Sequence, residues 1–177
     1  IRNFPKDIDA ADAIRRITER IYDFYVQHNL LDELKAEPGK RFTANGVIYS
    51  YARNEVWQVG DCQCIIDNLY SSNEKEIDAI MADVRAVVNE VALLGGATMK
   101  DLESHDPGRE FIYPFLQKQA LLQNCPIQGQ PFSFSVFDGF PVQMEQVKVF
   151  PVGDAKEVVL ASDGYPHLYS TCLLYTS

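Results

Sequence analysis

The sequence predicts an α+β fold in which antiparallel sheets are covered by helices. The first observation is the order of its periodic segments, which runs helix, strands, two helices, strands. Runs of strands separated by runs of helices favour antiparallel sheets, because a doubly wound parallel sheet needs strict alternation of strand and helix. The second observation is composition. The chain has 177 residues, of which 46% are hydrophobic and 23% are charged, and these values are typical of a globular domain with a sizeable core.

The net charge of the chain argues against two classes of binding partner. The chain carries 16 Lys and Arg against 25 Asp and Glu, a formal net charge of −9. Nucleic acid and anionic lipid are bound by clustered basic side chains, so we expect no nucleic-acid partner and no membrane partner. No apolar run approaches the roughly 20 residues of a transmembrane helix, and the first residues do not form a secretory signal. A cytoplasmic location is therefore expected.

The first half of the chain predicts one helix and a group of strands. Apolar residues recur at helical spacing over 7–34, with Asp7 or Asp9 available as the N-cap. Aromatic and β-branched residues then predict strands, separated by turns at 53–54 and 60–61. The expected strands are 42–51, 55–59 and 62–66, which together form an antiparallel meander.

The second half predicts two helices and a further group of strands. A helix over 73–94 has a broad apolar face, Ser71, Ser72 or Asn73 as its cap, and Gly95-Gly96 at its end. A polar connector at 101–109 leads to a helix at 110–124. Alternating residues at 132–137, a hairpin turn at Asp138-Gly139, and strands at 142–149 and 157–161 complete the chain.

Two carboxylates share an unusual context, because each follows an apolar strand and adjoins a glycine. Asp61 comes after Gly60, and Asp163 comes before Gly164. Carboxylates held at strand ends can bind a hard divalent cation, which prefers oxygen ligands and open positions for water. By spacing alone, two ordinary turn aspartates are the favoured interpretation.

Two segments resemble the PP2C (PPM) family of metal-dependent protein Ser/Thr phosphatases. Residues 43–48 and 56–63, TANGVI and VWQVGDCQ, are similar to the family's "T-A … V-G-D-S-R" segment. Residues 158–165, VVLASDGY, are similar to its "L-A-S-D-G" segment. The order and separation of the two segments also suit this family, of which the chain is identified as a divergent member.

The resemblance implies a fold, a cofactor and a reaction. The fold is an α/β/β/α sandwich of two antiparallel sheets flanked by helices, incomplete in this chain. Two or three Mg²⁺ or Mn²⁺ ions would be held by Asp163, the core ligand, and by Asp61, a ligand of a weaker ion, beside the backbone of Gly60 and Gly164. Metal-activated water, rather than a catalytic side chain, would hydrolyse a phosphoserine or phosphothreonine protein.

Departures from the family pattern keep other functions open. Cys62-Gln63 replaces the usual Ser-Arg, and the family's "S-R-x-x-G-D" segment is replaced by an aromatic stretch at 111–115. A catalytically silent PP2C-like regulatory or binding domain is therefore the alternative. An N-terminal nucleophile hydrolase is a third, although Ile1 is no nucleophile. Residues 136–140, VFDGF, superficially resemble an early metal motif, but a hairpin turn is preferred.

The ends of the chain are expected to delimit a partial domain. Residues 1–171 are interpreted as part of a PP2C-like phosphatase domain, and residues 172–177 as a non-native tail left by library preparation. The family's other metal motifs would lie outside 1–171, so this fragment alone is expected to be inactive. Cys62, Cys64 and Cys125 are expected to be buried, reduced thiols.

Overall fold

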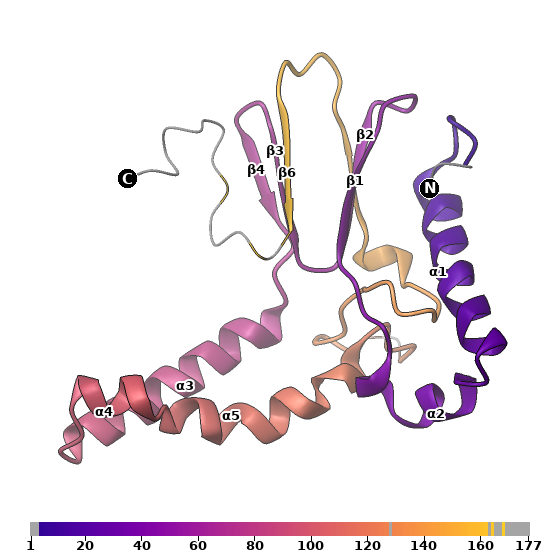
Figure 1. Ribbon diagram of the computed structural model, residues 1–177. Helices are drawn as coiled ribbons and strands as arrows, with labels where there is room; N and C mark the ends of the chain where they lie inside the picture. The colour runs from indigo at the N-terminus through magenta and orange to yellow at the C-terminus, as the bar shows by residue number, and fades with distance from the viewer. Residues whose placement is uncertain (1–3, 128, 163, 165–167, 169–177) are drawn as a thin grey trace.

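A computed structural model describes residues 4–127, 129–162, 164 and 168 (Figure 1). Its strands form two small antiparallel sheets accompanied by helices, which confirms the predicted α+β class. The first sheet has the strand order β1 (Gly46–Ser50), β2 (Glu55–Val59), β5 (Lys148–Pro151). The second has the order β4 (Leu69–Ser72), β3 (Cys62–Ile66), β6 (Val158–Ser162).

The chain crosses from one sheet to the other at residues 60–61. The strands β2 and β3 do not pair with each other, since β2 lies between β1 and β5 while β3 lies between β4 and β6. The expected single meander is therefore wrong. The core lies between the sheets, where Val56 of β2 packs with Cys64 and Ile66 of β3. Burial raises the pKa of the Cys64 thiol, which keeps it protonated.

The helix α1 (Ala10–Gln27) covers the outer face of the first sheet (Figure 1). Its Ala10 and Ala13 pack on Trp57, and its N-cap is Asp9, whose carboxylate accepts a hydrogen bond from the backbone of Asp12. The expected helix over 7–34 is divided in two, because Asn29 adopts a φ of 56° and interrupts it. A short helix α2 (Leu31–Ala36) follows.

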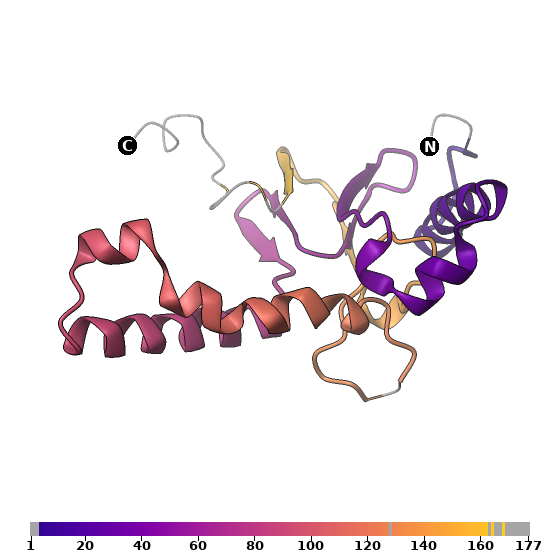
Figure 2. The ribbon, with the colours of Figure 1, turned by 60° about the horizontal axis from the view of Figure 1, so that its bottom comes forward.

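A helical arm extends away from the sheets (Figures 1 and 2). It consists of α3 (Glu76–Leu94), α4 (Met99–Ser104) and α5 (Pro107–Lys118). The expected polar connector thus contains α4, which Thr98 and Asp101 stabilise by a capping box. The residue at the N-cap of α3 is Lys75, so the expected caps at Ser71, Ser72 or Asn73 are wrong.

Hydrogen bonds to one carboxylate link α3 and α5, the two long helices of the arm. Asp106, the N-cap of α5, accepts hydrogen bonds from Asn89 at 3.0 Å and from Arg85, both on α3. The Arg85 guanidinium lowers the pKa of Asp106 to about 2. Of the described residues of α3, Ile77 alone is buried; most of the predicted apolar face is half-buried, and Val87 and Val91 are exposed.

The segment before β5 differs most from expectation. Residues 132–137 make only isolated bridges, Ala44 with Phe137 and Gln123 with Phe134, instead of a strand. The expected turn aspartate, Asp138, is fully buried, and it is paired with Arg41 at 3.0 Å. This buried ion pair draws the segment inward. The expected hairpin at this position is therefore wrong.

Candidate metal centre

The turn between the two sheets carries the first predicted metal ligand. Gly60 has a φ of 74°, a left-handed conformation, and Asp61 follows it directly before β3. The backbone of Gly60 is held on both sides: its N–H donates to Ser135 Oγ at 3.3 Å, and its carbonyl accepts from Asn73 Nδ2 at 3.0 Å. The predicted turn is confirmed, and it is held rigidly.

Glycine is required at position 60 by space as well as by conformation. A Cβ atom there would lie 2.2 Å from Asn45 Oδ1 and 2.9 Å from the carbonyl oxygen of Ser135. Real Cβ atoms do not approach other atoms so closely. The turn that presents Asp61 therefore depends on the absence of a side chain at Gly60.

Gly60→Ala is expected to lower the free energy of unfolding by about 2–4 kcal/mol, from the left-handed φ together with the steric clash. Gly153→Ala is the matched control, because Gly153 also has a positive φ, 59°, but has open space around its Cβ position. The control should cost about 1–2 kcal/mol. Urea denaturation measures both, and equal losses would contradict the role given to the close contacts.

Asp61 lies beside a lysine ammonium. Lys75 Nζ is 3.6 Å from Asp61 Oδ2 and 3.1 Å from Asp78 Oδ2. The side chains of Asp61 and Lys75 are each 20% exposed, so this ion pair is largely shielded from water. The ammonium also lies 5.1 Å from the centre of the Phe134 ring. Two carboxylates thus converge on one positive charge next to the turn.

The second predicted ligand, Asp163, lies outside the described residues. Its neighbours along the chain are placed: Ser162 ends β6, and Gly164 is exposed in a turn. The β3–β6 register pairs Ser162 with Cys62, the residue after Asp61. The end of β6 and the beginning of β3 therefore lie at the same end of the second sheet.

The described residues at the turn supply few ligands for a divalent ion. None of them forms a group of three His, Cys, Asp or Glu side chains able to hold a metal. Mg²⁺, however, is commonly bound through one or two carboxylates while keeping several waters. Asp61 and Asp78 supply such carboxylates, and they already hold a cation, the Lys75 ammonium. The described residues therefore supply at most these two carboxylates toward Mg²⁺ or Mn²⁺, and the other predicted ligand, Asp163, lies outside the described residues.

A pocket of about 270 Å³ opens beside the turn. Gly60, Lys75 and Phe134 contribute to its wall, together with Lys148, whose ammonium donates to the carbonyl of Ser72 at 2.7 Å. The pocket gives a small molecule or side chain access to the side of the turn that carries Lys75. Sequence reasoning missed Lys75, although its spacing to Asp78 is that of a helical ion pair.

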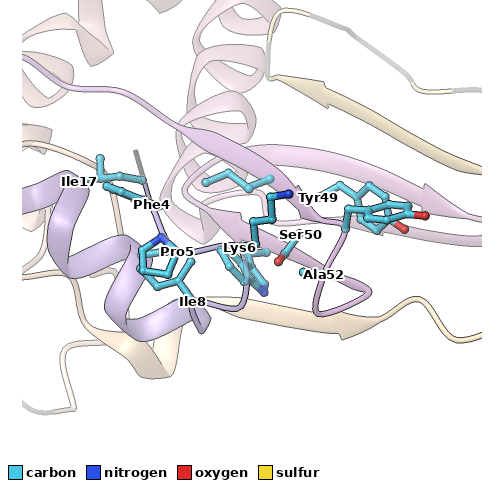
Figure 3. Close-up of a pocket in the computed structure, with 12 residues that line it drawn as sticks. Phe4, Pro5, Lys6, Ile8, Ile17, Tyr49, Ser50 and Ala52 are labelled. Carbon is cyan, nitrogen blue, oxygen red and sulfur yellow. The ribbon is translucent and has the colours of Figure 1, made fainter. Parts of the chain in front are cut away.

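A second pocket, of about 410 Å³, lies between the start of the chain with α1 and the β1–β2 hairpin (Figure 3). Phe4, Ile8 and Ile17 line one side, and the β1–β2 hairpin with Tyr49 lines the other. This hairpin is at the end of β2 opposite Gly60. The lining is mostly apolar, and neither predicted metal ligand contributes to it.

Comparison with known proteins gives no assignment. No family model, curated protein or solved structure matches the chain. Among the described residues, no helix is both long enough and apolar enough to cross a membrane.

Proposed function

We propose that this chain belongs to a PP2C-type, Mg²⁺- or Mn²⁺-dependent phosphatase that hydrolyses phosphoserine or phosphothreonine in proteins. The observation that carries the proposal is the pairing of Cys62 with Ser162. It brings Asp61 and the end of β6 to the same end of the second sheet, and Asp163 is the next residue of the chain. The two segments that resemble the family thus meet in space, although about 100 residues separate them along the chain.

Three layers of the finer fold proposed, a PP2C-like α/β/β/α sandwich, have counterparts among the described residues, while α3, α4 and α5 extend away from the sheets and do not form the fourth layer (Figures 1 and 2). Two antiparallel sheets enclose a common core, and α1 covers the outer face of the first. We propose that residues 1–171 form part of such a domain. The proposed tail at 172–177 lies outside the described residues.

Each described residue at the turn has a role in this proposal. A bound divalent ion supplies Lewis acidity, which activates water and neutralises phosphoryl charge. Asp61 contributes a carboxylate toward the ion, and Gly60 fixes the position of that carboxylate through its bonds to Ser135 and Asn73. Asp163 is proposed as the principal ligand.

The test is phosphate release from p-nitrophenyl phosphate by the natural protein that contains this chain. Release should require Mn²⁺ or Mg²⁺ and stop with EDTA. Asp61→Asn should lower the rate about 10–100-fold, the size of effect seen when groups supporting a metal are removed. Asp154→Asn, an exposed aspartate in the β5–β6 connection, is the control and should leave the rate unchanged. Metal-independent release, or an unaffected Asp61→Asn variant, would contradict the proposal.

One observation favours a second function, a catalytically silent PP2C-like binding domain. The Lys75 ammonium lies where a cation near Asp61 would be bound. Were this lysine to replace the metal permanently, the protein would bind a phosphopeptide without releasing phosphate. The phosphate-release assay, run beside a phosphopeptide-binding assay, distinguishes the two functions.

A further inference from the structure

We infer that α3 carries a docking surface for a partner protein, which binds it with an amphipathic helix whose apolar side is bordered by Lys or Arg. The surface is the α3 stripe, a row of apolar residues that recur alternately after four and three positions. Its members are Ile80, Val84, Val87, Val91 and Leu94. This inference goes beyond the proposed function and does not depend on it.

The α3 stripe has the spacing by which one helix packs along another. Apolar residues at alternating intervals of four and three lie on one side of an α-helix and form the seam of a coiled coil. From Ile80 to Leu94 the stripe is about 20 Å long, because each residue of an α-helix adds about 1.5 Å. A partner helix of about four turns would therefore cover it.

Much of the α3 stripe is open to solvent. Arg85 and Asn89, which bond to the N-cap of α5, are each two positions from Val87. Two positions correspond to about 200° around an α-helix, so these bonds lie on the side of α3 opposite Val87. The side chains of Val87, Val91 and Leu94 are 59%, 63% and 83% exposed, and the arm extends away from the sheets (Figure 2). Contiguous exposed apolar surface of this kind marks interaction sites.

A row of acidic side chains borders the stripe on one side. Glu76, Asp83 and Glu90 recur at intervals of seven, and the last two directly precede Val84 and Val91 of the stripe. All three acidic residues are exposed, and none takes part in the ion pairs found among the described residues. Lys or Arg side chains along a partner helix would complement this row.

The same acidic row argues against a second copy of this chain as the occupant. If two α3 helices paired in antiparallel fashion, their acidic rows would face each other, and like charges in such positions repel. If they paired in parallel, each acidic row would lie against the opposite flank of the other stripe, where Met81 and Val88 are apolar. Neither arrangement gives the carboxylates a basic partner.

The experiment measures the binding of a fluorescein-labelled model peptide to the 177-residue chain by fluorescence anisotropy. The peptide is an amphipathic helix of about three heptads, with Leu at the seam positions and Lys at the flanking positions. A matched peptide has Glu in place of Lys. At low salt the Lys peptide should bind at least about tenfold more tightly than the Glu peptide, and 0.5 M NaCl should reduce this difference, because salt screens exposed charges.

One pair of variants tests the apolar stripe. Val91→Ser should weaken binding of the Lys peptide about tenfold, the affinity equivalent of losing one buried valine side chain. Serine and valine have similar helix propensities, so α3 should stay folded, which circular dichroism checks. Leu69→Ser is the control, because Leu69 is 60% exposed but lies on β4, and it should leave the affinity unchanged.

A second pair of variants tests the acidic row. Asp83→Asn combined with Glu90→Gln should weaken binding of the Lys peptide about threefold at low salt, which is the scale of two exposed ion pairs. Asp23→Asn combined with Asp154→Asn removes the same number of exposed charges away from α3 and should have no such effect. This control separates the acidic row from the net charge of the chain.

Three results of the binding assay would overturn the inference: no binding of the Lys peptide, equal affinity for the two peptides at low salt, or unchanged affinity in Val91→Ser. Sedimentation velocity of the chain without peptide tests the other occupant. A monomer is expected. A dimer that Val91→Ser dissociates would also overturn the inference, because a second copy would then occupy the stripe.

Discussion

Asp138→Ala is expected to lower the free energy of unfolding by about 3–5 kcal/mol, the usual cost of leaving a buried charge without its partner. Asp138 is fully buried, and its Oδ2 lies 3.0 Å from Arg41 Nη1. Its Oδ1 accepts hydrogen bonds from Asn124 Nδ2 at 2.8 Å and from the Phe140 backbone at 3.0 Å. Alanine would remove the carboxylate that accepts all of these interactions.

Other contacts hold the Arg41 side chain in place, so that it cannot turn outward into water when the Asp138 carboxylate is removed. Its Nε donates to the carbonyl of Leu34 at 2.9 Å, and its guanidinium stacks 3.8 Å from the centre of the Phe140 ring. Only 11% of its side chain is exposed. The substitution therefore leaves a buried guanidinium uncompensated, which accounts for the large expected loss.

Urea denaturation at neutral pH measures the loss. Glu33→Ala is the control, because it breaks an ion pair to Lys40 whose side chains are about half exposed, and it should have little effect. Combining Asp138→Ala with Arg41→Ala should cost less than the sum of the two single changes, since the stranded charge is then removed. A loss below about 1 kcal/mol in Asp138→Ala would contradict the buried-pair account.

Local sequence signals predicted the elements that depend on nearby residues. The helix cap, predicted at Asp7 or Asp9 and found at Asp9, the turn at Gly60, and the strand predicted at 157–161 and found at Val158–Ser162 follow from side-chain chemistry and alternation within a few residues. These features need no distant partner, and the structure contains each of them. The α+β class follows from their order along the chain.

Elements that depend on distant partners were not predictable in this way. Asp138 looked like a hairpin aspartate because its neighbours are Phe137 and Gly139, but its partner Arg41 lies 97 residues earlier. The strand β4 was missed because Leu69 and Tyr70, at its start, are exposed and show no clear alternation. Periodicity correctly predicted α3 as a helix, but it could not say which surface, if any, covers its apolar face.

The candidate site also combines a feature that nearby residues predict with one that depends on residues distant in the sequence. The turn that carries Asp61 could be predicted, because a glycine and an aspartate follow an apolar strand. The ammonium of Lys75 beside it could not, because the chain forms β3 and β4 between the two residues before it returns. The prediction for Asp163 falls outside the described residues and is left to experiment.

Asp163→Asn is expected to lower metal-dependent phosphate release about 10²–10³-fold, the range typical of removing one group that stabilises transition-state charge. The amide keeps the size of the side chain but lacks the negative charge that a hard cation requires. The effect should exceed that of Asp61→Asn, because the resemblance to PP2C phosphatases gives Asp163 the core ligand position.

The most direct test of the central claim is the rate of phosphate release by the natural protein containing this chain, with and without Mn²⁺, compared with its Asp163→Asn variant. The account predicts release that depends on Mn²⁺ in the parent protein and falls at least about 100-fold in the variant. Equal rates in the two proteins, or equal rates with Mn²⁺ and with EDTA, would contradict it.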